Sequence, residues 1–167
     1  YTNMDPEPVS ERTPVFRNIH ISNLTGTKVN AAVKVLGLEE MPVSDITLSN
    51  VYIQSKIGLD INRAKNIVLN NVRIDASTGS PFVLSNVENA VLTNVATGMP
   101  NTSVSLININ DSKEIYIQGC FPQAGNKAFL RMQGENTTII LKNNYLKRLP
   151  QKLDDESKGN RKNLIIE

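Results

Sequence analysis

A seven-residue pattern that recurs along the chain constrains the fold more than any other feature. The pattern is polar, apolar, any, apolar, any, Asn, apolar, and its clearest copy is NIVLNNV at residues 66–72. Other copies start at residues 18, 45, 89 and 114 and near residue 138, so the spacings are 27, 21, 23, 25 and about 24. A second stretch with alternating apolar residues precedes the later copies, such as IGLDINR at 57–63 and SPFVLSN at 80–86. This regularity indicates one structural unit repeated along the chain.

Each unit consists of a strand, a short turn, a second strand and a variable connection. No unit contains a helix-length stretch with apolar residues at a 3.6-residue period. A leucine-rich repeat would place its Asn three residues after a strand leucine, whereas Asn71 follows Leu69 by two. A propeller blade needs about 40 residues and four strands, which is longer than these units. The sequence therefore predicts an all-β parallel β-helix of about six coils over residues 18–146, between a lead-in segment (1–17) and a charged C-terminal tail or cap (147–167).

The recurrent asparagines suggest a structural role at one corner of every coil. Asn tolerates the left-handed backbone conformation that a sharp corner requires, and stacked asparagines can bond amide to amide. Gly119 takes the same place in the fifth copy, and glycine also accepts that conformation. Exposed loop asparagines without a ladder are the alternative. The predicted ladder consists of Asn23, Asn50, Asn71, Asn94 and Asn143.

The composition argues against several classes of partner and cofactor. The net charge of +2 is too small to indicate nucleic acid binding, and no run of 18 apolar residues predicts membrane insertion. The lone Cys120 allows no intrachain disulfide, and neither a cysteine–histidine cluster with metal spacing nor a glycine-rich phosphate loop occurs. We therefore expect no cofactor and no metal. His20 and the pairs Glu39–Glu40 and Asp154–Asp155 are interpreted as solvated surface groups, although His20 could also serve as a ligand or a base.

The stretches EPVSERTPVFRNIHISNLTGT (7–27) and NAAVKVLGLEEMPVSDITLSNVYIQSKIG (30–58) resemble glycoside hydrolase family 28, the polygalacturonases and related pectin hydrolases. The resemblance covers roughly residues 7–100. It implies a right-handed single-stranded parallel β-helix, which agrees with the repeat. It also implies inverting hydrolysis of galacturonic acid linkages by a general acid and a general base that flank the bond.

The motifs that carry this chemistry in the family are Asn-Thr-Asp, Asp-Asp, Gly-His-Gly and Arg-Ile-Lys, and this chain lacks them as functional motifs. Its histidine has no flanking glycine, its Asp-Asp lies in the charged tail, and residues 73–75 are Arg-Ile-Asp. We therefore predict no catalytic residue in this chain. The expectation is the C-terminal portion of such an enzyme without its catalytic coils, inactive alone, and secreted, periplasmic or at the cell surface.

In the family, the outward face of the first strand of each coil lines the substrate groove. The charged residues at these places are Lys34, Asp60, Arg63 and Arg131. Since polyuronates are anions, lysine and arginine would be suitable partners for a pectic polysaccharide or oligogalacturonide. The alternatives are solvated strand charges without a function, and a non-catalytic β-helix module for carbohydrate binding or structural assembly.

The N-terminal coil has no amphipathic helix ahead of it that could cap its strands. An uncapped β-helix end exposes unpaired strand edges. We therefore expect this end to pack against an upstream part of the same β-helix or against another chain.

Overall fold

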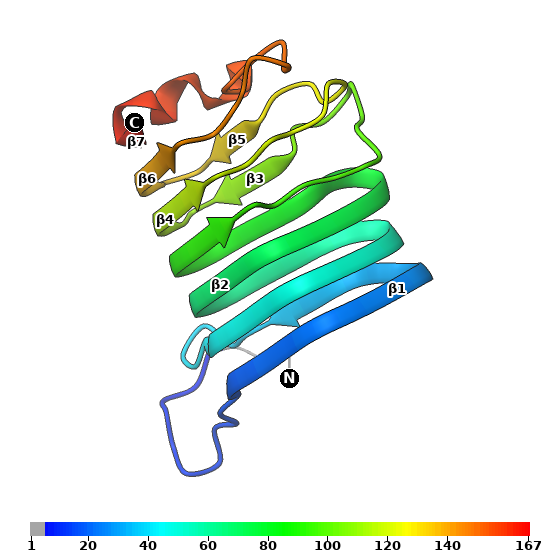
Figure 1. Ribbon diagram of the computed structural model, residues 1–167. Helices are drawn as coiled ribbons and strands as arrows, with labels where there is room; N and C mark the ends of the chain where they lie inside the picture. The colour runs from blue at the N-terminus through cyan, green and yellow to red at the C-terminus, as the bar shows by residue number, and fades with distance from the viewer. Residues whose placement is uncertain (1–5) are drawn as a thin grey trace.

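The computed structural model describes residues 6–167 as a stack of parallel β-coils, and it confirms the predicted fold with about six turns. Figure 1 shows the coils rising from the blue N-terminal end to the red C-terminal end. The elements in chain order are β1 (Arg17–Leu36), β2 (Val43–Thr93), β3 (Ile107–Asn110), β4 (Lys113–Gln118), β5 (Leu130–Gln133), β6 (Thr137–Lys142), the 3₁₀ helix η1 (Asp155–Asn163) and β7 (Leu164–Ile166).

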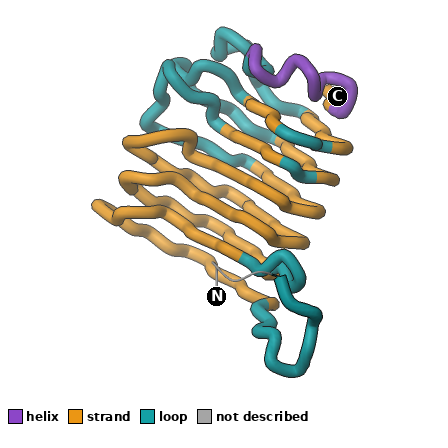
Figure 2. Tube along the Cα trace, turned by 180° about the vertical axis from the view of Figure 1, so that it is seen from behind, coloured by secondary structure: helices purple, strands orange, loops and turns teal. Residues whose placement is uncertain are grey.

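The long strands β1 and β2 wrap around the solenoid instead of running straight. Their backbone stays extended except at single residues with positive φ, such as Asn50 (54°), Asn66 (55°) and Asn71 (54°). Each of these residues turns the chain by one corner, so one continuous strand of 51 residues passes through several coils. Figure 2 shows these corners as bends in the orange trace.

The coils stack into three parallel sheets. The first sheet contains residues 31–36, 57–62 and 82–85 together with β3 and β5. The second sheet contains residues 19–22, 46–49, 67–70 and 88–93 together with β4, β6 and β7. The third sheet contains residues 24–26, 51–53 and 72–74 and closes with the bridge between Arg73 and Ala96.

The interior is built from aliphatic side chains that alternate with outward polar ones. Leu59, Ile61, Leu69, Leu84 and Leu92 have no exposed surface. Equivalent residues of neighbouring coils lie in register, as Leu84 beside Ile109 and Ile109 beside Met132. Because each coil buries its apolar side chains against the next, stability accumulates over coil interfaces.

The two ends of the solenoid differ. At the C-terminal end, Leu153 bridges to Leu130, η1 follows, and β7 pairs in parallel with β6 (Figure 1). At the N-terminal end, β1 pairs with β2 on one side and, among residues 6–167, with nothing on the other. No helix among the described residues is long and apolar enough to cross a bilayer.

Candidate functional site

Three of the four charged residues predicted to bind substrate lie in one row along the outer face of the first sheet. Lys34 pairs in register with Asp60, and Asn108 pairs with both Val83 and Arg131. Asp60 and Val83 hold equivalent places in successive coils. The residue after each of them, Ile61 or Leu84, lies the same number of residues before the first inward residue of the following second-sheet strand. The row therefore runs through Lys34, Asp60, Val83, Asn108 and Arg131.

A second outward row lies two residues further along each strand and is polar over most of its length. Leu36 pairs with Asn62, and Asn110 pairs with Ser85 and Gln133. Asn110 Nδ2 donates to Ser85 Oγ at 3.0 Å, so this row is linked from coil to coil. The two rows together form a strip of amide, hydroxyl and charged groups, which we call the polar strip: Lys34, Leu36, Asp60, Asn62, Val83, Ser85, Asn108, Asn110, Arg131 and Gln133.

Lys34 is the free cation of the polar strip. Its side chain is exposed and makes no ion pair with any residue of the described range 6–167. Asp60 is the one carboxylate of the strip, and it lies beside Lys34 in the register of β1 and β2. A single carboxylate cannot serve as both general acid and general base, which inverting hydrolysis requires.

Arg63 differs from its expected place. It was predicted at an outward strand position, but its backbone has a φ of 56° and turns the corner after the first sheet. Its guanidinium lies 3.9 Å from the Glu39 carboxylate, and both side chains are well exposed. Arg63 therefore stands at the margin of the polar strip, in a weak surface ion pair.

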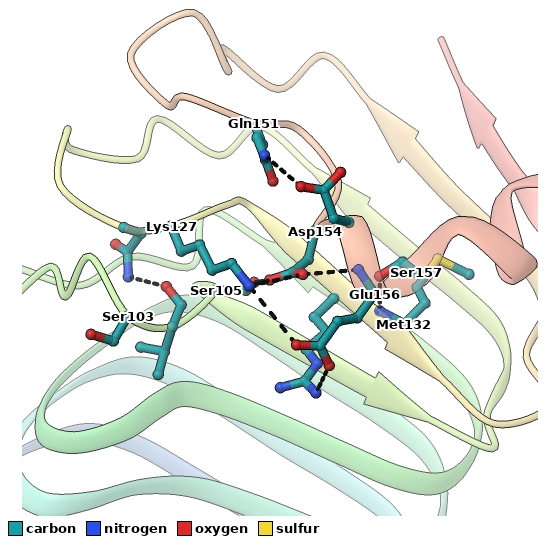
Figure 3. A network of polar contacts seen from close by, with 12 residues as sticks. Ser103, Ser105, Lys127, Met132, Gln151, Asp154, Glu156 and Ser157 are labelled. Atoms are coloured by element: carbon teal, nitrogen blue, oxygen red, sulfur yellow. Dashed lines mark hydrogen bonds and ion pairs between the residues drawn. The ribbon is translucent and has the colours of Figure 1, made fainter.

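Arg131 contacts the network of Lys127, Asp154 and Glu156 that fastens the C-terminal cap (Figure 3). Its Nη2 donates to Glu156, and Glu156 also lies 4.0 Å from Lys127 Nζ. Lys127 Nζ contacts Asp154 at 3.0 Å, and Ser105 Oγ donates to the same carboxylate at 3.1 Å. The charge of Arg131 is thus already balanced by an acidic partner.

The solvated surface role predicted for Asp154 is wrong. Its side chain is 1 % exposed. Burial raises the pKa of this carboxyl, but hydrogen bonds from the Glu156 backbone, Lys127 and Ser105 outweigh burial and lower the pKa overall. Asp154 is also the N-cap of η1 and accepts from the Glu156 N–H. It is therefore a structural anion that starts the terminal cap.

The asparagines at the corner after the second sheet form a hydrogen-bonded ladder. Asn50 Nδ2 donates to Asn23 Oδ1 at 3.2 Å, Asn71 to Asn50 at 2.9 Å, and Asn94 to Asn71 at 3.0 Å. All four have φ between 52° and 56°. Gly119 (63°) and Asn143 (53°) occupy the same corner in the next two coils, but within residues 6–167 no side-chain hydrogen bond joins them to the other four. We call this series the asparagine ladder.

A second ladder stands at the corner before the second sheet. Asn66 Nδ2 donates to Asp45 Oδ1 and Asn89 Nδ2 donates to Asn66 Oδ1, each at 2.9 Å. The three residues have φ between 55° and 59°. Its sequence signal is the polar residue at the first position of the repeat, which was not interpreted as a corner.

Asp75 is a buried carboxylate on the third sheet that the sequence did not single out. Its side chain is 2 % exposed, and it accepts from Arg73 Nε (3.1 Å), Arg73 Nη2 (2.9 Å), Tyr52 Oη (3.1 Å) and the Gly98 N–H (2.5 Å). Burial raises its pKa, but these donors together lower it. With four donors around two oxygens, Asp75 has little capacity left for a substrate proton and acts as a cross-link between coils.

No group of three or more His, Cys, Asp or Glu side chains within residues 6–167 could hold a metal ion. Cys120 is buried, and burial raises its pKa to about 11, so it is held as a thiol.

No family model matches this chain, and neither does any curated protein or solved structure compared with it.

Proposed function

We propose that this chain is the C-terminal β-helix part of a polygalacturonase-like glycoside hydrolase that acts on pectin, either galacturonan or rhamnogalacturonan. The polar strip carries the proposal, because it offers an unpaired cation and a series of amide and hydroxyl groups along one face of a parallel β-helix. The chain would supply scaffold and substrate-binding side chains, while the catalytic carboxylates would come from coils outside it. Action on pectin would place the protein outside the cytoplasm, in the periplasm, at the cell surface or in the medium.

The spacing of the polar strip suits an extended polysaccharide. Stacked strands repeat at about 4.8 Å, which is close to the length of one sugar unit, so successive coils can address successive sugars. Asn108, Asn110 and Arg131 each retain a buried polar atom with no protein partner among the described residues. These atoms have almost no exposed surface, so a sugar could reach them only if the side chains turned outward, and the exposed Lys34 remains the main group open to a ligand.

The test is binding of purified oligogalacturonates to the chain, measured by isothermal titration calorimetry. We expect Lys34→Ala to weaken binding about two- to fivefold, as for an exposed charge pair, and the loss to shrink at high salt. The control is Lys113→Ala, which removes another exposed lysine from the second sheet, where it pairs with Glu88 at 3.0 Å. Equal affinity of both variants, or no binding by the unaltered chain, would refute the substrate-binding role.

Release of reducing ends from polygalacturonate tests the catalytic half of the proposal. We expect none from this chain, because the polar strip contains one carboxylate instead of the required pair. Hydrolysis that survives Asp60→Asn would show that a catalytic pair exists elsewhere and that the proposal is mistaken.

The second candidate is a non-catalytic β-helix module for carbohydrate binding or structural assembly. The observation in its favour is that Asp75 and Asp154 are both engaged in structural networks. Preference for neutral over acidic oligosaccharides, or absence of all sugar binding, would favour this alternative.

A further inference from the structure

The N-terminal face of the solenoid exposes apolar side chains whose equivalents in the next coil are buried in the core. Ile21 is 40 % exposed, whereas its register partner Leu48 is 2 % exposed. Leu24 is 42 % exposed, whereas its partner Val51 is 2 % exposed. The inward residues of β1 thus form the N-terminal end of the interior, and within residues 6–167 no further strand covers them on the side away from β2.

The asparagine ladder has a direction, and its first rung is incomplete. Every amide of the ladder donates toward the preceding coil, from Asn94 to Asn71, from Asn71 to Asn50 and from Asn50 to Asn23. Asn23 accepts from Asn50, but its own Nδ2 donates to no group within residues 6–167. The group that would complete it is an oxygen acceptor at the equivalent corner one coil upstream.

We propose that this face docks one further parallel β-coil, whose inward residues are apolar and whose corner residue is Asn or Asp. The coil would pair with the free edge of β1, cover Ile21 and Leu24, and accept from Asn23 Nδ2. This face would recognise its partner by three features: parallel strand pairing in register, an apolar interior, and an oxygen that accepts from Asn23 Nδ2. The inference does not rest on the proposed sugar binding.

Segment 6–16 enters the second sheet at the place where the connection from a preceding coil would enter it. Residues 37–42 connect a first-sheet strand to the second sheet through a bend, with a hydrogen bond from Leu38 N–H to Met41 O at 3.3 Å. Segment 6–16 also leads into the second sheet, and it contains a turn closed by a hydrogen bond from Thr13 N–H to Ser10 O at 3.0 Å. Its last carbonyl, Phe16 O, accepts from Ser44 N–H, which is the ladder bond at the start of the pairing between β1 and β2, while most of the segment ahead of it is exposed. By the order of the later coils, a first-sheet strand comes before such a connection.

A second copy of the chain fits this face poorly. The C-terminal end is occupied by η1 and β7, so head-to-tail stacking of two copies is blocked. Two N-terminal faces related by a two-fold axis would oppose coils of reversed direction, which prevents parallel pairing around the coil.

The experiment supplies a coil of known sequence. A copy of residues 66–86 is fused ahead of Pro6 in place of residues 1–5, because this coil carries the inward residues Ile67, Leu69, Val72 and Ile74 and the acceptor Asn71. The control extension has the same length, with the four inward residues of the copy changed to serine. Hydrogen–deuterium exchange is followed in β1, with β4 and β6 as internal references that report whether each variant is folded.

We expect the apolar extension to slow exchange of β1 amides about tenfold or more relative to both the unextended chain and the serine control. It should also reduce binding of the dye ANS, because Ile21 and Leu24 become covered. Equal β1 exchange in the two extensions would overturn the proposal. So would slow β1 exchange in the unextended chain that depends on protein concentration and coincides with a dimer in analytical ultracentrifugation, since that outcome identifies a second copy as the occupant.

Discussion

The substitution Asn71→Ala tests what the asparagine ladder contributes. Asn71 lies in the middle of the ladder, where it donates to Asn50 and accepts from Asn94, and its φ is 54°. Alanine removes both hydrogen bonds and places an ordinary residue in the left-handed region. The neighbouring Asn70 has an exposed side chain with no hydrogen bond among the described residues, so Asn70→Ala is a control one residue away.

The expected cost follows from these two contributions. Each ladder bond is exposed, so its net value is about 0.5–1 kcal/mol, and the two together contribute about 1–2 kcal/mol. Holding alanine in the left-handed region costs about 1–2 kcal/mol more. The sum is about 2–4 kcal/mol for Asn71→Ala, which corresponds to a fall in Tm on the order of 10 °C for a chain of this size. Asn71→Gly loses the bonds without the backbone penalty and should cost about 1–2 kcal/mol, while Asn70→Ala should stay within about 0.5 kcal/mol.

Urea denaturation followed by far-UV circular dichroism at neutral pH measures these differences directly. The order of stability should be wild type and Asn70→Ala together, then Asn71→Gly, then Asn71→Ala. If Asn71→Ala is as stable as Asn70→Ala, the ladder bonds and the corner conformation contribute nothing. If Asn71→Gly is the less stable of the two Asn71 variants, the assignment of a backbone penalty to alanine is wrong.

Two further predictions concern buried groups away from the polar strip. Asp75→Ala should cost about 3 kcal/mol near neutral pH, because it leaves Arg73, Tyr52 and the Gly98 N–H without their acceptor, although Arg73 keeps solvent access. Because the pKa of Asp75 is lower in the folded protein, its stabilisation is complete above the unfolded pKa of 3.8 and is lost as the pH falls through the folded pKa. The difference in free energy of unfolding between wild type and Asp75→Ala, measured by urea titration, should therefore become smaller in acid. A difference that does not change with pH would contradict this. Burial raises the pKa of Cys120 to about 11, so this thiol should resist iodoacetamide at pH 8 in the native protein and react once urea unfolds it. Labelling of the native protein at the rate of a free thiol would contradict the buried position of Cys120.

The architecture was accessible from the sequence because it is repeated. A solenoid repeats the same corner in every coil. A polar residue that interrupts strand alternation once per coil can therefore be recognised by its recurrence, whereas a single such residue in one strand could not. This is why the sequence alone places Asn50, Asn71 and Asn94 at a corner. The corner at Asp45, Asn66 and Asn89 repeats equally well, but a polar residue at the start of a strand is common and was not distinguished from an ordinary strand boundary.

The candidate site was harder to predict because its charges are not repeated. Alternation correctly placed Lys34, Asp60 and Arg131 on the outer face, since inward and outward positions follow from the strand period. Alternation cannot tell which outward charge is free, because partners such as Glu156 come from distant segments. Arg131 is held by the cap and Arg63 lies at a corner, so Lys34 is left as the cation with no acidic partner among residues 6–167.

The two structural carboxylates show why burial of an acid does not by itself indicate chemistry. Asp75 and Asp154 are both nearly inaccessible, and both have a lowered pKa because several donors outweigh the cost of burial. A general acid needs the opposite balance, in which burial wins and the proton is retained near neutral pH. Asp60, half-buried on the outer face, has no second carboxylate beside it in the polar strip. Under the proposed function, the catalytic carboxylates would come from coils stacked on the N-terminal face, and the polar strip would extend the substrate path that those coils begin.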